Sequence, residues 1–252
     1  MASDSKELQM NSQNIRKRLK LDYLILPLII VLAFYMACIP HSSYPYPVHL
    51  DEWIHLACSN QIISQGTTVG LADPFTGGSS VGNQQLEIGF HLLWAVFHQI
   101  SGISWLTIFK YFPSIIFMIT VLSVYALARR QGFGWEAAFF TCLIPTTVGI
   151  LGPGFMVPVA LGLPFIALSL FVAFNSRRWW SYLVLAILVT FLFLLHSATA
   201  VGLITILAPY ILFNVRHNFK HSLGIALALA IPFLASSLRN SNFSPPDCGK
   251  RK

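Results

Sequence analysis

Residues 23–40 read YLILPLIIVLAFYMACIP, a stretch without a single charged side chain. Its length matches the roughly 20 mostly apolar residues that a helix needs to cross the hydrocarbon core of a bilayer. Runs of the same kind recur along the chain as far as Leu238. The whole chain is 55% hydrophobic and 10% charged, whereas soluble domains contain about 25% charged residues. The sequence therefore predicts an all-α fold, a polytopic transmembrane helical bundle.

The chain divides into three predicted regions. Residues 1–21 are polar and carry five basic side chains, which indicates a cytoplasmic N-terminal tail. The apolar stretch that follows is longer than the 7 to 15 residues of a signal-peptide core, so we expect an uncleaved anchor. Residues 22–238 form the predicted transmembrane domain. Residues 239–252 have the composition of an unstructured tail, and a truncated end is one interpretation of it.

Basic residues decide the predicted topology, because lysine and arginine gather on the cytoplasmic side of a membrane. No lysine or arginine lies between Lys20 and Lys110. If the apolar run 86–100 does not cross the membrane, the four basic clusters before residue 239 all fall on the cytoplasmic side. These clusters are residues 1–20, 129–130, 177–178 and 216–220. We therefore expect about seven spans in a plasma membrane, with the N-terminus in the cytoplasm.

The expected spans leave one large extracytoplasmic segment, residues 41–104, as the first outer loop. A helix is predicted over residues 51–65, ending at Gly66, because glycine commonly stops a helix. The run 86–100 places Glu87, His91 and His98 on about one face, which is typical of an amphipathic helix lying at the membrane surface. A loop of turn formers begins at Asp73. The predicted spans cover residues 23–40, 105–128, 137–151, 155–174, 179–195, 198–213 and 223–238.

The outer loop carries the candidate catalytic pair, Asp51 and Glu52. A carboxylate at this surface can deprotonate a hydroxyl acceptor or hold a divalent ion that neutralises a phosphate. The alternative is structural, since acidic residues favour the N-cap and first turn of a helix. Asp51 and His55 are the candidate ligands for such an ion, Mg²⁺ or Mn²⁺. Six of the eight histidines lie on the expected outer side, which also permits metal binding.

Two further polar residues interrupt the apolar pattern. Lys110 is the one basic residue inside an apolar segment, and it is a candidate to bind the phosphate of a lipid-linked donor. Its alternative is a lysine that extends to the membrane interface. His196 stands between two predicted spans, where a polar cap is the favoured interpretation.

Several function classes lose support from the sequence. The His-Glu-x-x-His, Gly-x-Ser-x-Gly, P-loop and Gly-x-Gly-x-x-Gly patterns are absent, which disfavours hydrolases and nucleotide-driven motors. The net charge of +7 is not arranged as a basic face interleaved with aromatic residues, so no nucleic-acid partner is expected.

The order of these features resembles the GT-C superfamily of membrane glycosyltransferases, which includes protein O-mannosyltransferases and oligosaccharyltransferase subunits. The resemblance rests on residues 51–66, on Asp73-Pro74-Phe75, and on the span end Tyr125-Ala126-Leu127-Ala128-Arg129-Arg130. It implies transfer of a sugar from a polyprenyl-phosphate-linked donor to a protein or glycan acceptor, beside membrane lipid. Asp51 would then be the base or metal-linked carboxylate, with Glu52 as its partner.

The chain also departs from the family pattern. The second outer link, residues 149–157, holds no acidic residue, whereas oligosaccharyltransferases carry a second acidic motif there. Their C-terminal Trp-Trp-Asp domain is absent from this sequence. The expected function is a GT-C-like enzyme or its N-terminal portion. The alternatives are a non-catalytic membrane protein, either a transporter or an assembly partner, and an inactive truncated remnant.

Overall fold

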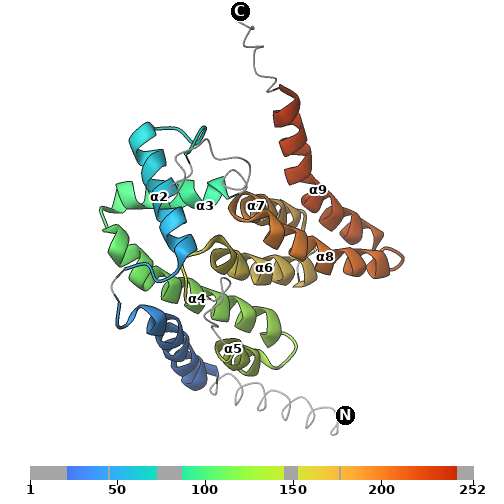
Figure 1. Ribbon diagram of the computed structural model, residues 1–252. Coiled ribbons are helices and arrows are strands. Elements are labelled where there is room, and N and C mark those ends of the chain that lie inside the picture. Colours follow the sequence, from blue (N-terminus) through green and yellow to red (C-terminus); the bar gives the residue numbers. More distant parts are fainter. Residues whose placement is uncertain (1–21, 45, 73–86, 145–152, 176, 243–252) are drawn as a thin grey trace, which may run out of the picture.

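The computed structural model describes residues 22–44, 46–72, 87–144, 153–175 and 177–242, with side chains as far as Leu234. The elements assigned within these ranges are helices, which confirms the all-α prediction (Figure 1). The turn formers from Asp73 onward and the N-terminal tail lie outside the described residues. Of the C-terminal tail, only the helical backbone as far as Asn242 is described.

The helices follow one another along the chain. The first, Asp22–His41, ends in the 3₁₀ turn η1 (Ile39–His41). The others are α2 (Leu50–Gln65), α3 (Ile88–Ser101), α4 (Trp105–Arg129), α5 (Gly134–Cys142), α6 (Pro158–Asn175), α7 (Trp179–Leu195), α8 (Ser197–Asn214) and α9 (Phe219–Asn242). The expected helix 51–65 is present with nearly its predicted bounds, and Gly66 ends it in the left-handed conformation at φ 65°.

Four helices in the described ranges are long and apolar enough to cross a membrane: Asp22–His41, α4, α6 and α8. Two more, Trp179–Leu195 and Phe219–Leu234, are apolar but shorter. The helix α5 stops at Cys142, and residues 145–151 of the span predicted there lie outside the described ranges. The protein thus has the helices of a membrane protein, while the count of seven spans stays a prediction.

The first helix shows most clearly how the bundle meets its surroundings. Tyr23, Leu24 and Leu28 are 80%, 68% and 67% exposed, although each is apolar or aromatic. Isolated exposed apolar residues are ordinary in soluble proteins, but a helix that is apolar all round belongs in a core or a bilayer. The exposed face of this helix therefore suits lipid.

The helix α3 does not have the dimensions of a span. Its 14 residues extend about 21 Å, short of the roughly 30 Å of a hydrocarbon core. It lies beside α2 and also contacts α7 (Figure 1). Its polar residues Glu87 and His91 turn toward His55 of α2. That α3 lies at the membrane surface and does not cross the membrane stays a prediction.

Polar contacts divide the bundle into two ends. At one end, which we call the far end, the Arg129 side chain lies 3.6 Å from Asp22 and Arg130 donates to Asn175. The basic end of α4 therefore lies beside the end of α6. At the other end, the α2–α3 end, α2 and α3 meet the links that precede α6 and α8. Most of the histidines and the acidic pair lie at this second end.

Between these ends the core is a continuous apolar packing of α6, α7, α8 and α9. Leu185, Val189 and Leu192 of α7 are fully buried against Leu203 of α8 and Ile225 of α9. A fully buried leucine contributes about 1.5–3 kcal/mol in water, and in lipid the packing itself supplies the stabilisation. Through α7, this part of the fold contacts α3 at the α2–α3 end.

Gly89 marks the tightest approach of α3 to the bundle. A Cβ atom at this position would lie 2.7 Å from the backbone oxygen of Leu194 in α7. Backbone cannot yield as a flexible side chain can, so only glycine fits here. Gly202 in α8 is different, because a Cβ atom added there would have no heavy atom within 4 Å beyond its own helical backbone.

We expect Gly89→Ala to lower the thermal unfolding temperature of the detergent-purified protein, since overpacking costs about 1–3 kcal/mol. Gly202→Ala is the matched control, and it should leave the temperature unchanged or raise it slightly because alanine favours helix more than glycine does. Intrinsic tryptophan fluorescence during heating measures both. Equal behaviour of the two variants would show that α3 does not pack against α7 as described.

Candidate functional site

The acidic pair lies in the first turn of α2, but its two members have different surroundings. The N-cap of the helix is His49, whose Nδ1 accepts from the Asp51 N–H at 3.2 Å. Glu52, at the third helical position, accepts in return from the His49 N–H at 3.1 Å. This reciprocal arrangement is a capping box with histidine in the place of the usual serine or threonine. Glu52 therefore has the helix-capping role that was the structural alternative to catalysis for this acidic pair.

Glu52 is fully buried and makes further contacts across the fold. Its Oε2 also accepts from the Val48 N–H at 2.8 Å, and its Oε1 accepts from the Met156 N–H at 2.7 Å. Hydrogen bonds to an ionised group are stronger than neutral ones and stabilise a buried carboxylate. Glu52 therefore ties the start of α2 to the link that precedes α6.

His41 strengthens this connection. Its Nε2 lies 3.0 Å from the Gly154 carbonyl oxygen and 3.7 Å from Glu52 Oε1, and the ring is buried. The end of the first helix, the start of α2 and the link before α6 are thereby held together. This set of contacts fixes the position of the neighbouring residue Asp51.

Asp51 itself remains accessible. Its side chain is 31% exposed, and a carboxylate oxygen lies 3.7 Å from His49 Nδ1. Burial raises the pKa of Glu87, the N-cap residue of α3, and the negative charge of Asp51 raises it further. Asp51 is therefore a partly exposed carboxylate at the rim of a polar cluster.

The polar cluster itself joins α2 to α3. His55, one turn after Asp51, has its Nδ1 2.9 Å from His91 Nε2 and 4.0 Å from Glu87 Oε2. The ligand-type atoms of these three residues all lie within 4.8 Å of one another. His91 is fully buried, and His55 is 6% exposed. We call His55, Glu87 and His91 the His–Glu cluster.

Burial dominates the electrostatics of the His–Glu cluster. Desolvation raises the pKa of Glu87 to about 7, with the Asp51 charge as the second cause. Desolvation also lowers the pKa of His55 to about 3, aided by His91 and His196, and lowers the pKa of His91 to about 4. Water is largely excluded, so both imidazoles are neutral at pH 7 and have lone pairs available for a ligand.

His196, in the link between α7 and α8, lies behind Glu87. Its Nδ1 accepts from the Thr199 N–H at 3.2 Å, which confirms the expectation of a polar cap between two helices. Because Nδ1 is an acceptor, the proton of the neutral ring lies on Nε2. That Nε2 faces Glu87 Oε1 at 3.6 Å. His196 is therefore placed to orient the Glu87 carboxylate.

The remaining candidates lie apart from this cluster. Lys110 is half-buried on α4 and its ammonium lies 5.5 Å from the centre of the Tyr111 ring. No contact joins it to Asp51 or to the His–Glu cluster in the described residues. His98, on the same helix as His91, stacks on Trp105 at 4.3 Å and contacts the Ile103 carbonyl. His98 thus closes the turn between α3 and α4.

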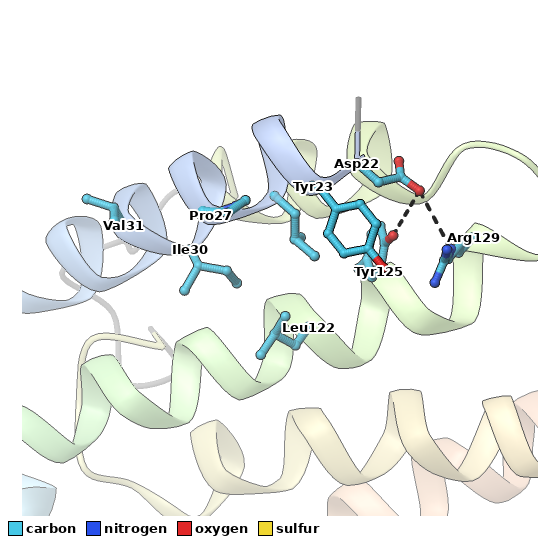
Figure 2. A pocket seen from close by; sticks show the side chains of 9 residues that line it. Asp22, Tyr23, Pro27, Ile30, Val31, Leu122, Tyr125 and Arg129 are labelled. Atoms are coloured by element: carbon cyan, nitrogen blue, oxygen red, sulfur yellow. Dashed lines mark hydrogen bonds and ion pairs between the residues drawn. The ribbon is translucent and has the colours of Figure 1, made fainter. Parts of the chain in front are cut away.

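A cavity of about 500 Å³ opens at the far end, between the first helix and α4 (Figure 2). Its wall is mostly apolar, and its polar corner is Asp22, which accepts from the Tyr125 hydroxyl and pairs with Arg129 (Figure 2). It lies away from Asp51 and the His–Glu cluster. Neither Asp51 nor any residue of the His–Glu cluster therefore lines this cavity.

The structure thus adds Glu87, His91 and His196 to the sequence-predicted residues Asp51 and His55. The sequence signal for the first two was present, because Glu87 and His91 are spaced four residues apart on one helical face. Their meeting with His55 depends on how α3 packs against α2, which no local pattern specifies.

We expect Glu52→Gln to destabilise the protein, because the amide NH₂ would face a backbone N–H that needs an acceptor. Loss of a hydrogen bond to a charged group costs about 1.5–3 kcal/mol. Asp51→Asn, one residue away, should change stability by less than about 0.5 kcal/mol as a partly exposed substitution. Thermal unfolding of both purified variants measures the difference. A loss of stability in Asp51→Asn as large as that in Glu52→Gln would contradict the anchoring role.

Neither family models, nor curated proteins, nor solved structures give a match to the chain.

Proposed function

We propose that the protein is an integral membrane glycosyltransferase that takes a sugar from a polyprenyl-phosphate-linked donor. Transfer to a protein or glycan hydroxyl takes place at the α2–α3 end, which faces the extracytoplasmic side of a plasma membrane. The observation that carries the proposal is the position of Asp51. Its carboxylate is partly exposed at the start of α2, while its neighbour Glu52 is buried and anchored. The resemblance to the GT-C superfamily supports the same function.

In this proposal Asp51 is the general base. It removes the proton of the acceptor hydroxyl as that oxygen attacks the anomeric carbon of the donor sugar. The new carbon–oxygen bond forms while the bond to the phosphate oxygen breaks, and polyprenyl phosphate leaves with the electron pair. Glu52 acts as a positioning residue, since its oxygens accept from the backbone of Val48, His49 and Met156.

The leaving phosphate also needs positive charge nearby. Lys110 is the predicted donor-phosphate ligand; it is half-buried on α4, with its ammonium 5.5 Å from the centre of the exposed Tyr111 ring. A divalent ion such as Mg²⁺ or Mn²⁺ at Asp51 is the other predicted source of charge. Asp51 offers a partly exposed carboxylate, the type of ligand that these ions prefer.

A second candidate function is a non-catalytic membrane protein, such as a transporter, an assembly partner or an inactive remnant of the enzyme. It is favoured by the number of polar groups used in structural contacts, since Glu52, His41 and His98 are all engaged with backbone atoms. In that case Asp51 would be part of a ligand-binding surface, and its amide replacement would leave sugar chemistry unaffected.

We expect Asp51→Asn to reduce sugar transfer by at least 100-fold, because general-base catalysis contributes about 10²–10⁴-fold. The assay follows labelled sugar from polyprenyl-phosphate mannose and polyprenyl-phosphate glucose to peptide and glycan acceptors, in proteoliposomes. Asp22→Asn, the same chemical change at the far end, is the matched control and should retain transfer. Unchanged transfer by a folded Asp51→Asn variant would exclude the role of base. Absence of transfer by the unsubstituted protein with every donor would favour the non-catalytic alternative.

The orientation is tested separately by cysteine labelling in sealed cells. Gln65 at the end of α2 and Gln131 in the α4–α5 link are both exposed. With a membrane-impermeant maleimide we expect label on Gln65→Cys and none on Gln131→Cys until the cells are opened, relative to the unsubstituted protein. Label on Gln131→Cys in intact cells would overturn the proposed orientation.

A further inference from the structure

We propose that His55, His91 and Glu87 form a binding site for a divalent transition-metal ion of the zinc class. The site differs from the Asp51–His55 pair expected from sequence, because two imidazoles and the carboxylate of another helix make up its ligand set. It does not depend on the proposed glycosyl transfer.

The distances suit such an ion. Zinc binds histidine nitrogen at about 2.0–2.1 Å and carboxylate oxygen at about 2.0–2.2 Å, so tetrahedral ligand atoms stand roughly 3.3–3.5 Å apart. His55 Nδ1 lies 2.9 Å from His91 Nε2 and 4.0 Å from Glu87 Oε2. Side-chain shifts of about half an ångström bring both of these distances to tetrahedral spacing. The third pair of ligand atoms, from His91 and Glu87, lies within 4.8 Å, and side-chain movement toward a shared ion has to close that distance as well.

The chemistry of the ligands selects the metal. Imidazole nitrogen suits zinc, copper, nickel and iron, whereas magnesium and calcium prefer oxygen ligands. Two of the three ligand residues are histidines, and both are buried. Three protein ligands leave a fourth position open, which is the arrangement of zinc sites that bind water or substrate. The site therefore favours zinc over Mg²⁺ or Mn²⁺.

A supporting shell surrounds the ligands. Metal-bound carboxylates and imidazoles are commonly held by hydrogen bonds from outside the first ring of ligands. His196 Nε2 faces Glu87 Oε1, the oxygen that does not face His55. Its ring is in turn fixed by Thr199. The carboxylate thus has His196 Nε2 3.6 Å from one oxygen and His55 Nδ1 4.0 Å from the other.

His91 supplies an independent observation. It is fully buried, and its Nδ1 has no hydrogen-bond partner within the described part of the chain. Buried polar atoms are nearly always satisfied, so an exception requires a compensating interaction. In the metal-free geometry the two rings share a single hydrogen bond between His55 and His91. His91 is thus a buried imidazole with one ring nitrogen unpartnered in the described residues, and it lies beside the other two ligand residues.

The competing explanation is a metal-free pair of core histidines joined by that hydrogen bond. The two explanations differ in one measurable property, which is whether the protein binds zinc through these side chains. Zinc binding can be measured without any sugar substrate, so its result is separate from that of the transfer assay.

The test uses the full chain, purified in detergent without a polyhistidine tag and stripped with a chelator. Titration with zinc chloride is followed by calorimetry, and titration with cobalt chloride by visible absorption, which reports the coordination of the ion. We expect one zinc per chain, tetrahedral cobalt bands, and a rise in unfolding temperature, since a ligand that binds only the folded state stabilises it. Magnesium chloride should produce none of these effects.

Single variants identify the ligands. His55→Gln, His91→Gln and Glu87→Gln should each weaken zinc binding by about 100-fold or more. His196→Gln should weaken it by about 10- to 100-fold, as expected for a residue that orients a ligand. His98→Gln, on the same helix as His91 but stacked on Trp105, is the matched control and should bind normally.

Circular dichroism of each variant separates a lost ligand from a lost fold, and the cobalt spectrum of any variant that still binds shows whether a nitrogen ligand has gone. The proposal is overturned if the folded unsubstituted protein binds no zinc. It is equally overturned if the His55, His91 and Glu87 variants bind as tightly as His98→Gln. Zinc binding by a protein that transfers no sugar would uphold this site while opposing the proposed enzyme.

Discussion

The Glu52 carboxylate, held by backbone N–H groups from two separate links, is the interaction on which the α2–α3 end depends. A buried charge is tolerated only when its desolvation is offset by strong hydrogen bonds, and Val48, His49 and Met156 provide them. Because these donors come from two links far apart in the sequence, they fix where α2 begins. The positions of Asp51 and His55 follow from that, one adjacent to the anchor and the other a turn further along the helix.

Local sequence patterns predicted much of the fold. The class, the bounds of α2 and its stop at Gly66 follow from apolar runs and turn chemistry, which act within a few residues. The run 86–100 likewise corresponds to α3, and the structure adds that Gly102 ends this helix in the left-handed conformation. The span count is harder, because α7 has only 17 residues and the expected span that begins with α5 continues outside the described ranges. Whether such a helix crosses a membrane depends on its neighbours and on the lipid.

The candidate site was predictable only in part. Asp51 and His55 stood out because they follow a charge-free stretch and share a helix, but Glu52 looked equivalent to Asp51 in the sequence. Their different roles come from the link before α6, which reaches Glu52 and not Asp51. The meeting of His55 with His91 is likewise a contact between residues 36 positions apart. Helical periodicity places each residue on a face, and only the packing of α2 on α3 brings the faces together.

The close contact of Gly89 with the Leu194 backbone has a consequence for sequence change in this region. Glu87 and His91 lie two residues before and two residues after this glycine, so the contact fixes the rotational register of both. A deletion or insertion of one residue between Glu87 and Gly89 would rotate Glu87 by about 100° around the helix axis relative to His91. Substitutions on the exposed face of α3 are therefore tolerable, whereas changes in length are not. A glycine without any chemical role thus determines which kinds of genetic variation the site can survive.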